Sequence, residues 1–267
     1  MKPISFMSAN FVARQVNYHM TEGWMQGDRA TNDYFRPLDT FAERFDLLLN
    51  EVVELGFHAI DIWTGHLNPL WATAEHVAIA KDLLNKHQLQ VASLAGGFGS
   101  TPVEFARSCQ IANELSTSVL GGGAALLATD RASVLAILAE HKLRLGLENH
   151  PQKTPQILLS DIGDNHRGLL GACVDTGWFG TQGYDAAQAL SELADSLVHV
   201  HLKDVLAAGA HQTCRFGLGV VPIERCLQTL QQIGYEGGIS VEHEPEEYDP
   251  RSDCAVGLRM VEAWLNS

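Results

Sequence analysis

The sequence predicts a single (β/α)8 barrel, a TIM barrel of parallel strands that occupies residues 1–267. Short apolar runs, each about the length of a buried strand, alternate along the chain with segments of helical periodicity. Eight such units fit the 267 residues without a linker between the two halves, and barrels of this kind commonly use about 250 residues. Eight sequential parallel units favour a closed barrel over a doubly wound sheet.

The first half of the chain contains four strand-like runs, which lie at residues 4–7, 59–63, 90–94 and 118–120. Apolar residues recur at helical spacing from Phe41 to Leu55, and Gly56 ends that helix. Thr73 is expected to cap a helix that runs to about Lys86. The segment Thr101-Pro102-Val-Glu104 is a capping box with proline at the first helical position.

Two further segments complete this half. Thr129 is expected to start a helix that runs to about Lys142. The polar and aromatic segment from Asn17 to Asp39 shows no periodicity, and we predict a long loop there. In a compact domain, a loop of that length is usually functional or covers an active site.

The second half has the more regular pattern. Four apolar runs end on the potential metal ligands Glu148, Asp175, His201 and Glu242. Helix-like segments follow these runs, with start signals at Thr154-Pro155, Asp185, Pro222 and Asp249-Pro250. The four side chains should therefore sit at the carboxyl ends of successive parallel strands, where barrels keep their chemistry.

Composition narrows the function classes. Lys and Arg number 18 against 32 Asp and Glu, which gives a formal charge of −14 and makes nucleic acid and anionic lipid unfavourable partners. The five cysteines lack CxxC spacing, so we expect packing thiols in a reducing compartment. We see neither a signal peptide nor a membrane-spanning stretch, and we expect a cytoplasmic protein.

Three carboxylates and one imidazole at one rim would form an oxygen-rich site for a divalent cation. Taken singly, each residue has a simpler explanation: a helix cap, a solvated loop acid or a core histidine. Their joint occurrence on four consecutive strands favours metal binding, because burying several unpaired carboxylates is costly. The donor set suits Mn²⁺ first, with Mg²⁺, Co²⁺ and Zn²⁺ as alternatives.

Four motifs resemble the xylose isomerase-like barrel superfamily: Glu148-Asn-His, Val174-Asp175-Thr-Gly, His199-Val-His-Leu-Lys-Asp204 and Ser240-Val-Glu242-His-Glu. The segment from Gly217 to Pro222 is similar to the family's C-terminal pattern. That superfamily includes sugar and sugar-phosphate isomerases and epimerases, inosose dehydratases and, more distantly, endonuclease IV. The resemblance covers nearly the whole chain and is concentrated after residue 145.

In the ketose 3-epimerase branch, the metal glutamates of strands five and eight also exchange the substrate proton. The resemblance therefore implies that Glu148 and Glu242 are the acid–base pair, with Asp175 and His201 as the other ligands. This chain departs from that branch at three positions of the substrate shell, which are Thr154, Trp178 and Arg215.

Five residues are candidates for substrate binding: His66, His150, Lys203, Arg215 and Trp178. Lys203 would share a strand face with His201, because side chains alternate along a strand. For each candidate a structural role stays open, such as an ion pair of Lys203 with Asp204. Trp24 and Trp63 are further aromatic candidates for stacking on a sugar.

The leading hypothesis is a metal-dependent isomerase or epimerase of a monosaccharide or related keto-polyol, acting through an enediolate. The alternative is an inosose dehydratase-like lyase that uses the same metal site. An endonuclease-like hydrolase and a non-catalytic sugar-binding protein are weaker alternatives. The sequence leaves a homo-oligomeric assembly open.

Overall fold

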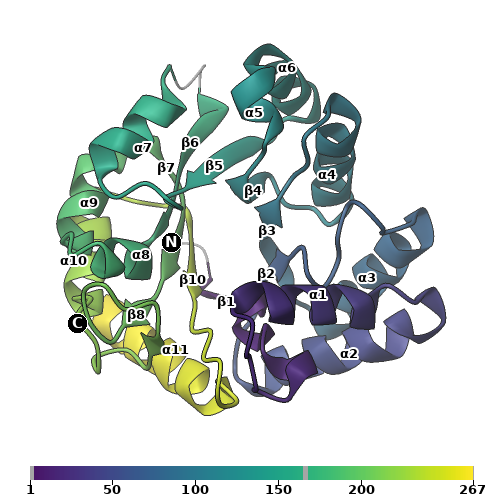
Figure 1. Cartoon of the computed structure of the whole chain (residues 1–267), viewed down its shortest axis with the longest axis horizontal. Coiled ribbons are helices and arrows are strands. Elements are labelled where there is room, and N and C mark those ends of the chain that lie inside the picture. Colours follow the sequence, from purple (N-terminus) through teal and green to yellow (C-terminus); the bar gives the residue numbers. More distant parts are fainter. Residues whose placement is uncertain (1–2, 165–167, 267) are drawn as a thin grey trace.

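Eight parallel strands close into a barrel in the computed structural model, which describes residues 3–164 and 168–266 (Figure 1). The barrel strands are β1 (Ser5–Met7), β2 (Ala59–Trp63), β3 (Gln90–Gly97), β4 (Val119–Gly123), β5 (Arg144–Glu148), β6 (Leu170–Asp175), β7 (Leu197–Leu202) and β10 (Gly238–Val241). Each strand pairs with its neighbours in chain order, and β1 closes the barrel by pairing with both β2 and β10. The predicted fold class is confirmed.

Helices surround the barrel (Figure 1). They are α1 (Trp24–Phe35), α2 (Leu38–Glu54), α3 (Ala74–His87), α4 (Pro102–Glu114), α5 (Leu126–Thr129), α6 (Arg131–His141), α7 (Pro155–Ile162), α8 (Thr176–Thr181), α9 (Ala186–Glu192), α10 (Ile223–Gln232) and α11 (Arg251–Leu265). The described residues also form the short 3-10 helices η1 (Ser8–Phe11), η2 (Arg14–Val16) and η4 (Ala194–Ser196). The hydrophobic core fills the layer between strands and helices.

Side-chain caps explain where several of the helices begin. Thr73 and Thr101 both form capping boxes, and Thr154 and Asp185 cap α7 and α9 through their side-chain oxygens. The expected start of α6 at Thr129 is one residue early, because the Asp130 carboxylate accepts the capping bond from Ser133 N–H.

The predicted loop from Asn17 to Asp39 is wrong, because it contains the helix α1. Polar residues dominate this helix, and Gly27 in its interior disfavours helix formation. The fold requires that glycine: a Cβ at Gly27 would lie 2.3 Å from the Val12 carbonyl oxygen. Tertiary packing of α1 against the segment after β1 therefore overrides its weak local propensity.

A small antiparallel sheet follows β7 and consists of β8 (Asp204–Val205) and β9 (Thr213–Cys214). The buried Asp204 carboxylate organises the long loop around it by accepting backbone N–H bonds from Val205, Gly217, Gly219 and Val221. Gly219 approaches so closely that a Cβ there would lie 2.3 Å from Asp204 Oδ1. In the described part of the chain, no helix has the length and apolar character needed to span a membrane.

Candidate metal centre

The four predicted ligands lie together at one end of the barrel. Glu148 and Asp175 are the last residues of β5 and β6, His201 is the penultimate residue of β7, and Glu242 directly follows β10. Strand pairing sets their heights, since His201 is in register with Asp175 on one side and Ser240 on the other. The expected clustering of these four side chains at the carboxyl ends of the strands is present in the structure.

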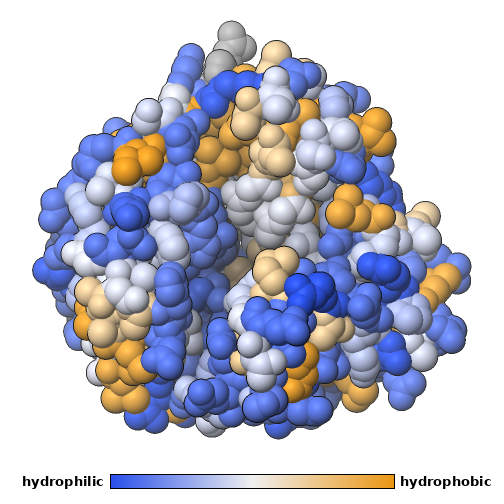
Figure 2. Space-filling model, viewed as in Figure 1, coloured by the Kyte–Doolittle hydropathy of each residue, from blue (hydrophilic) through white to orange (hydrophobic). Residues whose placement is uncertain are grey.

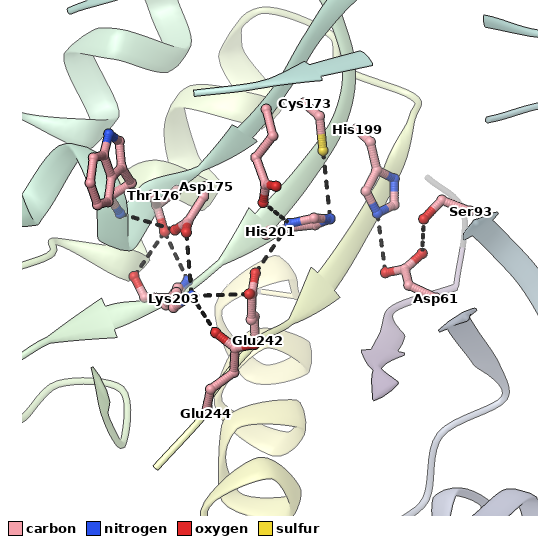
Figure 3. A network of polar contacts seen from close by, with 12 residues as sticks. Asp61, Ser93, Cys173, Asp175, Thr176, His199, His201, Lys203, Glu242 and Glu244 are labelled. Carbon is pink, nitrogen blue, oxygen red and sulfur yellow. Dashed lines mark hydrogen bonds and ion pairs between the residues drawn. The ribbon is translucent and has the colours of Figure 1, made fainter. Parts of the chain in front are cut away.

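Three potential metal-ligand atoms, from His201, Glu148 and Glu242, lie close together. His201 Nδ1 lies 3.1 Å from Glu148 Oε1 and 3.1 Å from Glu242 Oε2 (Figure 3). One imidazole nitrogen can donate one proton at most, so it cannot satisfy both carboxylates, and Glu242 Oε2 is a buried oxygen without a hydrogen-bond partner. A cation among these atoms would satisfy all three, so the residues fit a divalent metal ion.

Asp175 joins the same site through Lys203. The buried Lys203 ammonium lies 3.4 Å from Asp175 Oδ2, 3.0 Å from Glu242 Oε1 and 2.7 Å from Glu244 Oε2 (Figure 3). Lys203 directly follows β7, and these contacts place its side chain on the same side of the chain as that of His201, as strand alternation predicts. Asp204, which the sequence leaves open as an ion-pair partner of Lys203, instead binds backbone N–H groups.

His150 contacts the other side of the acid cluster. Its Nε2 lies 3.1 Å from Asp175 Oδ2, and its Nδ1 lies 3.9 Å from Glu148 Oε2. Donor atoms of Glu148, His150 and Asp175 therefore form a second candidate ligand group that shares Glu148 with the first. The two overlapping groups describe one continuous centre with five potential ligand residues.

The electrostatics of the centre favour the ionised form of Glu148 and Asp175 but oppose ionisation of Glu244. Burial alone would raise the pKa of Glu148, but the charges of His150 and His201 outweigh it and hold the pKa at about 2. Burial likewise opposes ionisation of Asp175, yet Lys203 and His150 hold its pKa well below the ordinary value. For Glu244, burial and the neighbouring Glu242 outweigh Lys203 and raise the pKa to about 7.

Two asparagines that the sequence analysis did not single out fix the backbone at this end of the barrel. Asn149 exchanges two hydrogen bonds with the backbone of Asp175. Asn10 does the same across β10: its Nδ2 donates to the Val241 carbonyl, and its Oδ1 accepts from His243 N–H. Each amide bonds to the backbone at or beside a predicted ligand. Asn149 and Asn10 therefore fix the backbone positions of Asp175 and Glu242.

A second polar cluster lies inside the barrel, beside His201. The fully buried Asp61 carboxylate accepts hydrogen bonds from Ser5 and Ser93 and lies 3.1 Å from His199 Nε2 (Figure 3). Burial opposes its ionisation, but His199 and His201 hold the pKa of Asp61 at about 2. Alternation along β7 could have suggested this cluster, because His199 stands two residues before His201 and shares its face.

A cavity of about 470 Å³ opens at the centre. Three tryptophans line it, namely Trp24, Trp63 and Trp178, and so do five carboxylates, namely Glu148, Asp175, Glu242, Glu244 and Glu246. Trp24 also donates from its indole Nε1 to Glu244 Oε1, so helix α1 contributes directly to the cavity wall. Hydrophobic residues on the face viewed in Figure 2 lie in separate patches among hydrophilic ones.

The five predicted substrate-binding residues lie in three different places. His150, Lys203 and Trp178 line the cavity with the four ligands. His66 does not: it lines a separate cavity, because its ring turns toward Ser8 and Phe35 behind Trp63. Arg215 is also outside the described lining of the metal cavity, since it lies in the loop that Asp204 holds against β8.

The fold and the site together define a class of protein: a (β/α)8 barrel with a carboxylate–histidine centre at the carboxyl ends of its strands. The sequence profile of the xylose isomerase-like TIM barrel family matches residues 49–263. The chain belongs to this family.

Solved structures with the same fold include a D-tagatose 3-epimerase-like protein, with a TM-score of 0.70 and 16% identity over 99% of this chain and 98% of that chain. Another is the probable 3-DHS dehydratase AsbF of Bacillus anthracis, with a TM-score of 0.66 and 15% identity over 98% and 99% of the two chains. At these identities the similarity shows the fold alone.

Among curated proteins, the chain is 40% identical over 68 residues to L-ribulose-5-phosphate 3-epimerase UlaE of Escherichia coli, a match that covers 25% of this chain and 24% of that protein. It is 28% identical over 120 residues to an uncharacterized protein of Methanocaldococcus jannaschii, covering 42% of this chain and 41% of the relative. The chain thus matches less than half the length of either relative.

Proposed function

We propose that the protein is a divalent-metal-dependent isomerase or epimerase of a monosaccharide or related keto-polyol, with Mn²⁺ as the first ion to test. One observation carries this proposal: Glu148 and Glu242 both reach His201 Nδ1. Around the barrel, β10 lies on one side of β7, while β5 lies on its other side, beyond β6. Two carboxylates thus approach one point from different directions.

The chemistry follows from that arrangement. A divalent cation, when bound, would supply Lewis acidity that stabilises negative charge on the substrate's oxygens. Glu148 is ionised at neutral pH, with a pKa of about 2, and can accept a proton from the carbon beside the substrate carbonyl. Glu242, when protonated, can give its proton to the other face of that carbon, which inverts the configuration. Proton exchange with solvent then returns both carboxyl groups to their starting forms.

The charge of the cavity favours a substrate without phosphate. Five carboxylates line it, while Lys203 is its one lysine and no arginine lines it among the described residues. Lys203 is already surrounded by Asp175, Glu242 and Glu244. The carboxylates also outnumber the cationic groups of Lys203, His150 and His201 together, so a phosphate group would meet more negative than positive side-chain charge. The rings of three tryptophans can instead pack against the C–H surface of a neutral sugar.

A lyase of a keto-polyol is the second candidate, and Lys203 favours it. Its ammonium nitrogen lies 3.0 Å from Glu242 Oε1 inside the cavity. After the same proton abstraction by a glutamate, the ammonium could donate a proton to a departing β-hydroxyl group, which leaves as water.

The formal charge of −14 argues against the phosphodiester hydrolase alternative and against nucleic acid as a partner.

The test is solvent exchange. The metal-loaded protein is incubated in D2O with a panel of free ketopentoses, ketohexoses and inososes, and with phosphorylated counterparts where available. We expect deuterium at the carbon next to the carbonyl of a free sugar and a product of unchanged composition. A product lighter by one water would establish the lyase instead. The absence of both exchange and turnover across the panel with every tested ion would contradict the proposal.

Variants identify the proton carriers. Glu148→Gln and Glu242→Gln should each lower turnover by about 10²–10⁴-fold, the usual contribution of a positioned acid or base. Glu236→Gln, at an exposed position outside the cavity, is the matched control and should be unchanged. Equal activity of all three variants would exclude the two glutamates from the reaction.

A further inference from the structure

A second cavity of about 490 Å³ lies outside the metal centre. It is bounded by η2, the end of α1, α2 and the start of α11, and it shares no lining residue with the first cavity. His66 and Trp63 mark the wall between the two, because their rings contact each other with centroids 5.4 Å apart while each lines a different cavity. The sequence predicts a substrate-binding role for His66, but this residue does not line the cavity of the metal centre.

The charge of this cavity is opposite to that of the first. Three arginines line it, Arg14, Arg44 and Arg251, against two acids, Glu51 and Asp249. Arg14 and Arg251 pair with these acids at 2.6 Å and 2.8 Å. Arg44 has no carboxylate within ion-pair distance among the described residues; its guanidinium lies 4.0 Å from the centre of the Tyr34 ring and donates to the Tyr34 carbonyl. One positive charge is left over in a chain of formal charge −14.

His66 offers this cavity a buried donor. Its side chain belongs to a residue only 2% exposed, and its Nδ1 lies 3.1 Å from Ser8 Oγ. Ser8 Oγ already accepts the Trp63 backbone N–H at 2.8 Å, so the hydroxyl proton is free for donation to Nδ1. Burial and the nearby Arg14 lower the pKa of His66 to about 3, which keeps the ring neutral. The single ring proton is then on Nε2, which has no protein acceptor in the described structure.

Tyr18 offers a second donor. Its hydroxyl oxygen is buried and has no hydrogen-bond partner within 3.5 Å in the described part of the chain, while the Arg14 side chain lies nearby. Asn17 and Tyr18 also hold successive left-handed backbone conformations, with φ of 52° and 56°. Non-glycine residues rarely adopt this strained region and often do so at ligand sites. Buried donors without acceptors are likewise rare in native proteins.

We propose that this second cavity binds a small oxyanion, a carboxylate or phosphate group carried by a metabolite, at a site separate from the metal centre. Arg44 supplies a positive charge that no described carboxylate pairs with. His66 Nε2–H and the Tyr18 hydroxyl supply two neutral hydrogen-bond donors that lack a protein acceptor among the described residues. An oxyanion can satisfy a cation and two neutral donors together, because it carries negative charge and several acceptor oxygens. Tyr34 and Phe35 form an apolar wall for the part of the metabolite that carries the group.

The experiment is isothermal titration of the metal-loaded, full-length protein with inorganic phosphate and, separately, with malonate. Tyr18→Phe removes one hydroxyl group and Arg44→Gln removes the unpaired charge. Arg36→Gln is the matched control. Arg36 directly follows α1, but its side chain is 58% exposed and lies outside the cavity lining. Glu148→Gln serves as a second control, since it alters the metal centre, where an anion could also bind.

We expect at least one of the two anions to bind. Arg44→Gln should weaken that binding by about tenfold or more, and Tyr18→Phe by a smaller factor, because bonds to charged groups are the stronger ones. Arg36→Gln and Glu148→Gln should leave it unchanged. Preference for phosphate or for malonate assigns the group that the site recognises.

Two results would overturn the proposal. One is that neither anion binds the wild-type protein. The other is that binding survives both Arg44→Gln and Tyr18→Phe, or is lost in Glu148→Gln, which would place the anion at the metal centre. Melting temperatures of all variants are measured first. If Arg44→Gln unfolds, the Tyr18→Phe comparison decides the outcome alone.

Discussion

Asn149 holds the backbone of Asp175 from both sides: its Oδ1 accepts from Asp175 N–H at 2.7 Å, and its Nδ2 donates to the Asp175 carbonyl at 3.0 Å. Both groups are fully or almost fully buried. Strand pairing between β5 and β6 ends at Glu148, so this side chain extends the hydrogen bonding by one residue beyond the strand. It thereby fixes the carboxylate of Asp175 relative to that of Glu148.

Asn149→Ala should therefore impair the metal centre without removing a ligand. We expect metal affinity to fall by about 10–100-fold, the usual effect of losing a group that orients ligands. The unfolding free energy should fall by about 1–3 kcal/mol for each backbone group left unpaired. Metal titration and chemical denaturation measure the two effects. Asn50→Ala, on the exposed face of α2, is the control, and equal metal affinity in both variants would contradict this role.

Metal loading should stabilise the fold. Because the donor atoms of Glu148, His201 and Glu242 already lie within 4.8 Å of one another, an ion can bind the folded state with little rearrangement. A free ion concentration of 100 times the Kd should add about 2.7 kcal/mol to the unfolding free energy. Thermal melts with Mn²⁺, Mg²⁺, Co²⁺ and Zn²⁺ after chelation measure this gain. It should disappear in His201→Gln and persist in Glu247→Gln, and a gain that survives His201→Gln would place the ion elsewhere.

Lys203 and a bound cation should partly replace each other as counter-charges for the acid cluster. Removal of the ammonium in Lys203→Met leaves Asp175, Glu242 and Glu244 without it, and breaking such a buried pair costs about 3–5 kcal/mol. We expect that cost in chelator and a smaller one with saturating Mn²⁺, both measured by denaturation. Lys86→Met removes a pair that is 58% exposed on the lysine side and should cost less than about 1 kcal/mol. If Lys203→Met lowered the unfolding free energy equally with and without the ion, the ammonium and the ion would not neutralise the same carboxylates.

The barrel and the clustering of four potential ligands at its rim were predictable because strand periodicity and strand-end position are local properties of the sequence. Glu148, Asp175, His201 and Glu242 each follow an apolar run, and parallel strands bring such positions together. The helix α1 was not predictable, since it depends on packing of Gly27 against the Val12 carbonyl, a contact that leaves no periodic signal.

Side-chain direction beyond the strand ends was also outside the reach of the sequence. His66 follows β2 by three residues, as a rim residue could, but its hydrogen bond to Ser8 turns it away from the metal centre. Asn149 and Asn10 escaped notice because their amides bond to distant backbone groups, which only the closed barrel brings near. Only the tertiary structure shows such long-range contacts.

Asp61 should make the protein sensitive to acid. The pKa of its carboxyl group is about 2 in the folded protein against an ordinary value of 3.8, because its interactions with His199, His201 and Ser93 outweigh the effect of burial. A lowered pKa means that the folded state favours the ionised group. The resulting stabilisation is fully present above about pH 4, and it is lost as the pH falls toward 2, where the folded protein also takes up the proton.

The difference between the two pKa values corresponds to roughly 2 kcal/mol of unfolding free energy. Asp61→Asn cannot ionise, so its unfolding free energy should decline less steeply than that of the wild type between pH 4 and pH 2. Urea denaturation at several pH values measures both curves. Asp82→Asn, at an exposed position of α3, should follow the wild-type curve. If Asp61→Asn also followed it, the His199–Asp61 contact would contribute nothing to acid stability, and the neutral form of Asp61 would fit the barrel interior equally well.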